Sequence, residues 1–287
     1  MSNLSPSDYA DLQAAVARLE SQSFAMKVAS KLGMPVEALL HRLPGPAQSA
    51  IKVTVDKALE QCLRIAVKAH KAKPSAAIYK RSHTTAAAIT GAVGGFFGLP
   101  GLLVELPVTT TVMLHSIVEI ARSQGEDLLN PETGLACLEV FALGPEDTHG
   151  DAKESAYYAT RAALAQVTRE AVSYVTQKGM AKESAPALIS FLGKIASRFG
   201  LEVSEKVAAE LVPIAGAVGG LTLNIMFSHH FQGLAEGHFT IRRLERKYGS
   251  QAVRQDYELA NSPPCKNLRK KASPIQGMIP PRSNPSG

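Results

Sequence analysis

Charged residues are unevenly distributed along this chain, and two long stretches carry no charge at all. Thr84 to Val104 is a run of 21 uncharged residues, and Leu211 to Ser228 is a second run of 18. The pentapeptide Gly-Ala-Val-Gly-Gly lies in both runs, at 91–95 and again at 216–220. Inside a helix, glycine costs about 1 kcal/mol relative to alanine. The strings therefore predict segments whose backbones approach another helix or a lipid surface closely.

Outside these runs, apolar positions recur at spacings of three and four, which is typical of amphipathic helices. Ile51, Val55, Leu59, Cys62 and Ala66 give the clearest example. No segment has the period of two that a half-buried strand requires. The periodicity, with the Pro, Gly and capping residues that interrupt it, predicts helices at about 5–31, 35–42, 51–66, 130–143, 151–178, 184–200 and 231–248.

The first uncharged run contains Gly98-Leu99-Pro100-Gly101, a combination that marks a turn. We therefore predict a helical hairpin near 84–123, with arms at about 82–97 and 103–123 and the turn at Pro100 and Gly101. The second run predicts a helix near 211–228 that starts at Pro213. The expected fold class is all-α, a helical bundle built around these two glycine-rich apolar segments.

Small residues in both runs share the spacing that allows two helices to touch backbone to backbone. The predicted packing positions are Ala87, Gly91, Gly94, Gly95 and Gly98 in the first run and Gly216, Gly219 and Gly220 in the second. Three interpretations are open: close packing of soluble helices, peripheral or re-entrant association with a membrane, and true membrane spanning. Asn224 is a polar residue inside the second run, and we expect it to form a hydrogen bond across to the first hairpin.

The net charge of +6 does not indicate a nucleic-acid binder once the positions of the charged residues are considered. Residues 261–287 carry five bases, six prolines and no acid, whereas the first 260 residues hold 26 bases against 25 acids. This composition predicts a disordered basic tail on a nearly neutral body. Aromatic residues make up only 6% of the chain and Trp is absent, so platforms for stacking bases are scarce.

Three cysteines, Cys62, Cys137 and Cys265, are far apart and form no CxxC pair, so no disulfide framework or zinc ribbon is expected. The first residues include an acid and no apolar run, unlike a secretory signal. A cytoplasmic location follows as the expectation, with peripheral contact to the cytoplasmic membrane as an option.

Several glycine- and proline-rich motifs together resemble the EcsC protein family. They are TGAVGGFFGLPGLLVELP at 90–107, Gly125-Glu-Asp127, Asn130-Pro-Glu132 and LEVFALG at 138–144. The string VPIAGAVGG at 212–220, with Asn224 and the helix at 239–248, resembles the C-terminal part of that family. The resemblance covers about 76–250, so we expect N-terminal helices at 1–75, an EcsC-like core at 76–250 and the tail at 261–287.

The resemblance implies an association with membranes or transport and names no reaction. The family takes its name from a bacterial protein encoded beside the subunits of an ABC transporter. Relatives commonly have Asp after the Leu-Pro-Gly motif, where this chain has Glu105.

Candidate catalytic residues cluster in sequence after the first glycine string, although Gly-x-Ser-x-Gly and His-Glu-x-x-His motifs are absent. They are Glu105, His115, Asp127 and Glu139. His115 lies four residues before Glu119 and could orient an acid–base pair, or simply lie at the edge of the core. Glu105 has two readings: a buried carboxylate that needs partners, or an acid that caps a helix starting at Pro107.

His229, His230 and His238 are candidate metal ligands. Adjacent histidines point about 100° apart on a helix, which disfavours a shared ion. The glycine strings lack a following Lys-Ser/Thr and a preceding strand, so no nucleotide site is expected, and no cofactor is predicted.

Two functional hypotheses follow. The first is a non-catalytic accessory protein that binds an anionic membrane surface or a membrane protein, helped by basic residues between Arg64 and Arg81. The second is a soluble hydrolase-like enzyme with a carboxylate and His site near the hairpin. The sequence predicts neither the oligomeric state nor a substrate.

Overall fold

The computed structural model describes residues 4–33, 41, 43, 45–69, 98–144, 155–178, 185–210 and 220–262. These parts of the chain are helical and contain no strand, which confirms the all-α class. The elements are α1 (Pro6–Leu19), α2 (Phe24–Leu32), α4 (Gly45–Ala69), α6 (Gly98–Ser123), α7 (Pro131–Glu139), the 3-10 turn η1 (Val140–Ala142), α8 (Ala156–Lys178), α9 (Pro186–Glu210), α11 (Gly220–Tyr248) and α12 (Ser250–Asn261).

Several predictions fall outside the described residues and stay predictions. They are the helix at 35–42, the hairpin arm up to residue 97, the domain boundary at 75, the tail beyond 262, and the packing positions Ala87, Gly91, Gly94, Gly95, Gly216 and Gly219. Of the predicted packing glycines, Gly98 and Gly220 are the first residues of α6 and α11.

Local capping signals mark several of the observed helix ends. The Ser5 side chain accepts a hydrogen bond from Asp8 N at 3.3 Å at the start of α1, and the Asn130 side chain accepts one from Glu132 N at 2.9 Å at the start of α7. Gly125 and Gly249 follow α6 and α11 with φ of 77° and 85°, a backbone conformation that favours glycine. These four positions show why helix starts and stops were largely predictable.

The single helix predicted over 5–31 is wrong, because the chain leaves the helical path after Leu19 and starts again at Phe24. The side chain of Ser23 accepts from Met26 N at 3.2 Å and caps the second helix. α1 can therefore pack along α11 and α12, while α2 contacts α9.

The predicted turn at Pro100 and Gly101 is also wrong, since both residues lie in the first turn of α6. The first backbone N–H groups of a helix have no partner within the helix, so a proline there costs no hydrogen bond. Pro107 lies inside α6 instead of starting it. The helix continues through Pro107 with Leu106 and Thr110 buried next to it.

Two further boundaries differ from the prediction. α9 passes through Gly200 and ends at Glu210, because the buried stripe of Phe199, Val203 and Val207 continues past the glycine. α11 joins the helices predicted at 211–228 and 231–248 into one element. At Gly200 tertiary packing outweighs the local helix-breaking signal, whereas residues 228–231 contain no glycine or proline that would end a helix.

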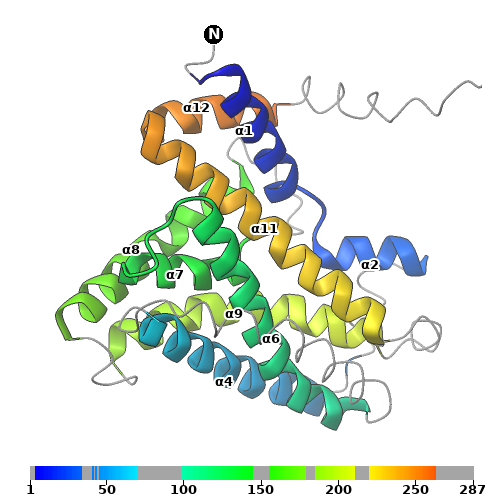
Figure 1. The fold of residues 1–287 in the computed structure, drawn as a ribbon. Helices are drawn as coiled ribbons and strands as arrows, with labels where there is room; N and C mark the ends of the chain where they lie inside the picture. Colours follow the sequence, from blue (N-terminus) through cyan, green and yellow to red (C-terminus); the bar gives the residue numbers. More distant parts are fainter. Residues whose placement is uncertain are drawn as a thin grey trace, which may run out of the picture.

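α11 crosses the molecule diagonally (Figure 1). α1 and α12 pack at its C-terminal end, whereas α6 and α9 contact it from the other side, with α4 packed on α6, α7 and α9. In this view α6 and α11 both start at the lower right and run upward to the left.

The core is rich in aromatic contacts although the chain holds few aromatic residues. Phe227 is in ring contact with Phe24 at a centroid distance of 5.0 Å and with Phe231 at 5.1 Å, and Phe141 is 4.9 Å from Phe199. These rings join α2, α9, α11 and η1, so each large side chain fastens two elements together.

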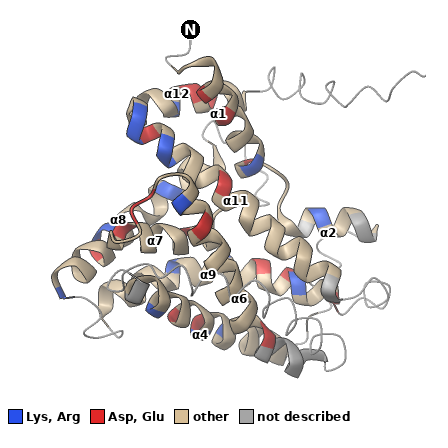
Figure 2. Ribbon diagram, in the orientation of Figure 1, with Lys and Arg blue, Asp and Glu red and all other residues tan. Residues whose placement is uncertain are grey.

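The exposed face of α4 carries both signs of charge. Lys52, Lys57 and Arg64 are exposed, but Asp56 and Glu60 share that side of the helix. Figure 2 shows both signs of charge interspersed along α4. The described side chains of α4 therefore do not form a strongly positive surface.

Candidate functional site: a buried charge cluster where three helices meet

A charge cluster is buried where the start of α6, the end of α9 and the start of α11 meet. Glu105 of α6, Lys206 of α9 and Asn224 of α11 are 8%, 1% and 7% exposed. The Lys206 Nζ atom lies 3.7 Å from Glu105 Oε1 and 3.2 Å from Glu210 Oε1. The Asn224 amide donates a hydrogen bond to Glu105 Oε1. Four polar side chains from three helices thus form one connected group.

Each member of the cluster depends on the others, since an unpaired charge in an apolar interior is expensive. The Lys206 ammonium also lies 5.7 Å from the centre of the Phe227 ring, so its apolar surroundings add a cation–π contact. Burial raises the pKa of Glu210, and the nearby Lys206 charge opposes that rise. The interpretation of Glu105 as a helix cap is wrong, because α6 begins seven residues earlier at Gly98. The Glu105 side chain is instead buried among the partners named above.

The prediction that Asn224 forms a hydrogen bond to the region of the first hairpin is confirmed, because its partner Glu105 lies within 84–123. Lys206 and Glu210 were not predicted to belong to a site. The signal was present, because Lys206 falls at helical spacing from Phe199 and Val203, inside an apolar stripe, where a solvated lysine is not expected.

The position of the cluster relates the two uncharged runs to each other. Glu105 is seven residues into α6, Glu210 is the last residue of α9, and Asn224 is four residues beyond the first residue of α11. The connection 211–219 between α9 and α11, and the chain that precedes α6, therefore leave the described fold at the same end. In sequence, these connections carry both Gly-Ala-Val-Gly-Gly strings.

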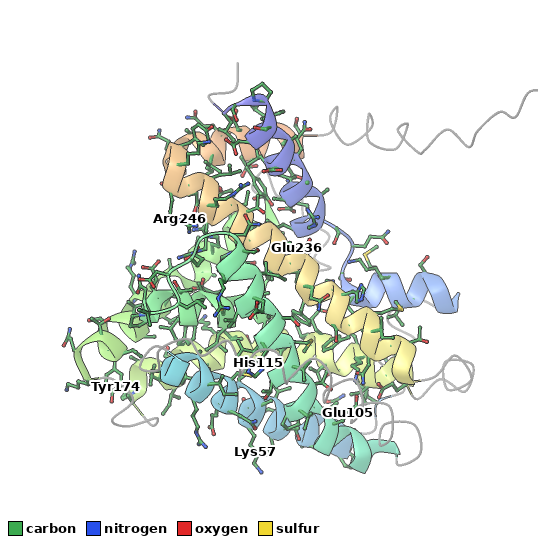
Figure 3. The ribbon with its side chains drawn as sticks, viewed as in Figure 1. Lys57, Glu105, His115, Tyr174, Glu236 and Arg246 are labelled. Carbon is green, nitrogen blue, oxygen red and sulfur yellow. The ribbon has the colours of Figure 1, made fainter. Side chains whose placement is uncertain are left out.

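The four predicted catalytic residues have separate environments. His115 Nδ1 lies 2.8 Å from the Thr111 carbonyl oxygen on the same helix, so the ring donates to its own backbone. Figure 3 shows Glu105 near the start of α6 and His115 well along it. Asp127 is exposed, and its Oδ1 accepts from Leu129 N at 2.9 Å in the loop before α7.

Glu139 ends α7 and accepts a hydrogen bond from the Thr168 hydroxyl of α8. Burial raises the pKa of Glu139, although that hydrogen bond opposes the rise. A groove between α4 and α9 is lined by none of the four candidates. Convergence on one concave site, which the hydrolase hypothesis requires, is not observed among the described residues.

The three predicted metal-ligand histidines also diverge. His229 is exposed, whereas the His230 Nδ1 atom lies 3.3 Å from the Lys27 ammonium group. His238 is fully buried, with Nδ1 3.0 Å from the Tyr157 hydroxyl. No group of three His, Cys, Asp or Glu side chains in the described ranges could hold a metal ion.

Comparison with protein families identifies the family of this chain. The model of the EcsC protein family matches residues 10–244, which is most of the chain. The chain belongs to the EcsC protein family. The match begins within α1, so the family includes the N-terminal helices as well as the motifs that first indicated it. No curated protein and no solved structure matches this EcsC protein.

Membrane spanning was one of three interpretations of the uncharged runs. Within the described segments, no helix of this EcsC protein is both long enough and apolar enough to cross a bilayer.

Proposed function

We propose that this EcsC protein is a non-catalytic accessory protein that attaches peripherally to an anionic membrane surface at the cytoplasmic side. The contact would be made by the parts of the two uncharged runs that precede α6 and α11, at 84–97 and 211–219. The single observation that carries the proposal is the buried cluster of Glu105, Lys206, Glu210 and Asn224. It holds the helix ends that flank both segments at one end of the fold.

The cluster gives the two segments a common point of attachment. A buried ion pair is rarely more stabilising than apolar packing, and its better-attested value is to fix one arrangement of the elements it joins. Two apolar segments that start from one rigid point act on the same surface together, so their weak contacts add.

Electrostatic attraction between basic residues and the anionic surface supplies a second contribution to membrane binding. The bases Lys68, Lys71, Lys73, Lys80 and Arg81 precede the first apolar segment, and five more lie in residues 261–287. Each base near an anionic surface contributes about 1 kcal/mol. Several such bases convert a weak apolar contact into stable binding that salt weakens.

Vesicle flotation tests the proposal directly. At low salt, wild-type protein should float with vesicles of phosphatidylglycerol and phosphatidylethanolamine, and less well with phosphatidylcholine alone. A Phe97→Asp/Ile214→Asp variant, with one acid in each uncharged segment, should lose flotation. Leu259→Asp is the matched control, because Leu259 is 60% exposed on α12 and lies in neither segment.

Two results would contradict the proposal. One is wild-type protein that stays at the bottom of the gradient with anionic vesicles at low salt. The other is equal loss of flotation in the Leu259 control, because the uncharged segments would then have no special part in binding.

A further inference from the structure

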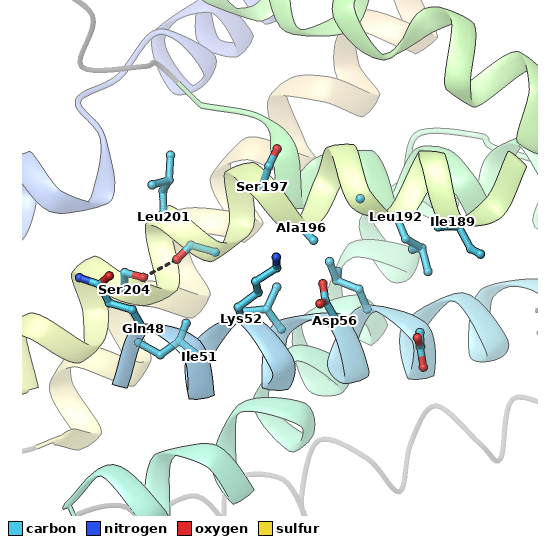
Figure 4. Close-up of a pocket in the computed structure, with 15 residues that line it drawn as sticks. Gln48, Ile51, Lys52, Asp56, Ile189, Leu192, Ala196, Ser197, Leu201 and Ser204 are labelled. Atoms are coloured by element: carbon cyan, nitrogen blue, oxygen red, sulfur yellow. Dashed lines mark hydrogen bonds between the residues drawn. The ribbon is translucent and has the colours of Figure 1, made fainter. Parts of the chain in front are cut away.

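A surface groove of about 860 Å³ runs between α4 and α9 (Figure 4). Its α4 wall presents Ile51, Val55 and Leu59 with Lys52 and Asp56 beside them. Its α9 wall consists largely of small residues, with leucines and an isoleucine between them. The groove is separate from the buried charge cluster and has no part in the proposed membrane contact.

The α9 wall is built for a close neighbour that the described chain does not supply. A Cβ atom added at Gly193 or at Gly200 would meet nothing within 4 Å. Glycine weakens a helix, and packing among the described residues does not account for these two glycines, because no described residue approaches them. On the same helix, Ile189 is 57% and Leu201 61% exposed, and both line this groove.

The groove-lining residues of α9 are arranged symmetrically about the point between Ala196 and Ser197. A second α9 packed antiparallel on the first would place Gly193 opposite Gly200 and Leu192 opposite Leu201. Near the centre, small residues would then lie on small residues and leucines on leucines, whereas at each end Ile189 would lie opposite Ser204. This is the self-complementary relation that a two-fold contact between identical chains requires.

The two charged residues on the α4 wall are arranged compatibly with the same two-fold symmetry. Lys52 and Asp56 both line the groove, one helical turn apart. In an antiparallel arrangement the Lys52 of each copy faces the Asp56 of the other, which gives two equivalent ion pairs. A lipid chain or an unrelated peptide would have no need of this arrangement.

We infer that the groove between α4 and α9 is the contact surface of a two-fold homodimer. Leu201 of each copy enters the groove of the other beside Gly193. The glycines permit the close approach, and the paired Lys52 and Asp56 side chains fix the antiparallel orientation.

Sedimentation velocity and light scattering over a range of concentrations test this inference without any membrane. Wild-type protein should show a concentration-dependent monomer–dimer equilibrium. Leu201→Glu should weaken the dimer on the order of 100-fold, because it would bury an unpaired carboxylate. Leu259→Glu, an equally exposed leucine on α12, should leave the dimer unchanged. Gly193→Leu/Gly200→Leu should fold normally, as both positions are open, and should be monomeric.

A charge exchange tests the orientation. Lys52→Asp and Asp56→Lys, each alone, should weaken the dimer about tenfold, and the two together should restore it. Circular dichroism confirms that each variant is folded. Wild-type protein that is monomeric up to about 1 mM, glycine variants that dimerise normally, or a double exchange that does not recover would each overturn the inference.

Discussion

The ammonium group of Lys206 and the carboxylate of Glu105 lie 3.7 Å apart, with side-chain exposures of 1% and 7%. They come from the end of α9 and the start of α6, and the amide of Asn224 brings α11 to the same carboxylate. Together with Asn224, this buried pair joins three helices. Loss of the pair should therefore lower the stability of the whole fold.

Removal of the lysine charge should be costly. Lys206→Met leaves Glu105 and Glu210 buried without a cation, and we expect it to lower the free energy of unfolding by about 3 kcal/mol or more. Glu105→Gln should cost less, because Lys206 keeps Glu210 as a partner. The double variant should be more stable than the two separate losses predict. Urea denaturation measures all three.

The control for that experiment is an exposed ion pair. Arg18 and Glu236 lie 2.9 Å apart with side chains 44% and 47% exposed, so Glu236→Gln should change stability by less than about 1 kcal/mol. If Glu236→Gln and Lys206→Met lower the free energy of unfolding equally, the buried cluster contributes no more to stability than an exposed ion pair.

Two glycines of α11, one turn apart, should respond oppositely to alanine. At Gly237 a Cβ atom would lie 2.6 Å from Leu19 Cγ and 3.2 Å from the Ala15 carbonyl oxygen, where α1 crosses α11. At Gly233 it would meet nothing within 4 Å. Gly237→Ala should therefore destabilise the protein by about 1–3 kcal/mol, and Gly233→Ala should stabilise it by up to about 1 kcal/mol. Thermal melts of the two variants test this prediction. A melting temperature that changes in the same direction in both variants would contradict the close crossing of α1 and α11.

His238 should make stability depend on pH in the mildly acidic range. Burial, together with the nearby charges of Arg161 and Arg242, holds the pKa of His238 well below 6.5. The folded protein thus keeps the ring neutral while the unfolded chain protonates it near pH 6.5. Its stabilising contribution is complete above pH 6.5 and falls by about 1.4 kcal/mol per pH unit below it.

His238→Asn tests this dependence. Arg161 donates to the Tyr157 oxygen, so the Tyr157 hydroxyl is free to donate to His238, and an asparagine oxygen can accept the same bond without titrating. Between pH 6.5 and 5 the variant should lose less stability than wild type, whereas His229→Asn, at an exposed position, should behave like wild type. Parallel curves for wild type and His238→Asn would contradict the prediction.

Buried thiols should be inert in the native protein. Burial raises the pKa of Cys62 to about 12 and raises that of Cys137 still further from its ordinary range. In a Cys265→Ser background, a thiol reagent should therefore react with no cysteine in the folded state and with two after unfolding. Rapid reaction of either thiol in the native protein would show that its helix is loosely packed.

Local signals predicted much of this fold, and long-range contacts explain the remainder. Ser5, Asn130 and Gly125 lie at helix ends as expected, because caps and left-handed glycines act within a few residues. Gly200 and Pro107 were misread, since burial on either side of them continues the helix. A single sequence shows a helix-breaking residue such as Gly200 or Pro107, but it does not show the packing that outweighs the effect of that residue.

The site was predictable in part. Asn224 stands out in the sequence as a polar residue in an apolar run, and its partner Glu105 lies within the predicted hairpin region, one residue after the first uncharged run. Lys206 was not predicted, because lysine on a helix is normally solvated and its contacts with Phe227 and Glu105 come from other helices. The candidate catalytic residues looked close in sequence, but α6 and the loop after it separate them in space.

Tryptophan fluorescence tests the central claim most directly, because the chain contains no tryptophan and any signal comes from the residue introduced. Phe97→Trp and Ile214→Trp place a reporter in each uncharged segment, and Leu259→Trp places one on α12. With anionic vesicles of brominated lipids, both segment reporters should be quenched strongly and the α12 reporter weakly. Absence of quenching in both segments, or equal quenching at all three positions, would contradict an attachment through paired segments held by the Glu105–Lys206 cluster.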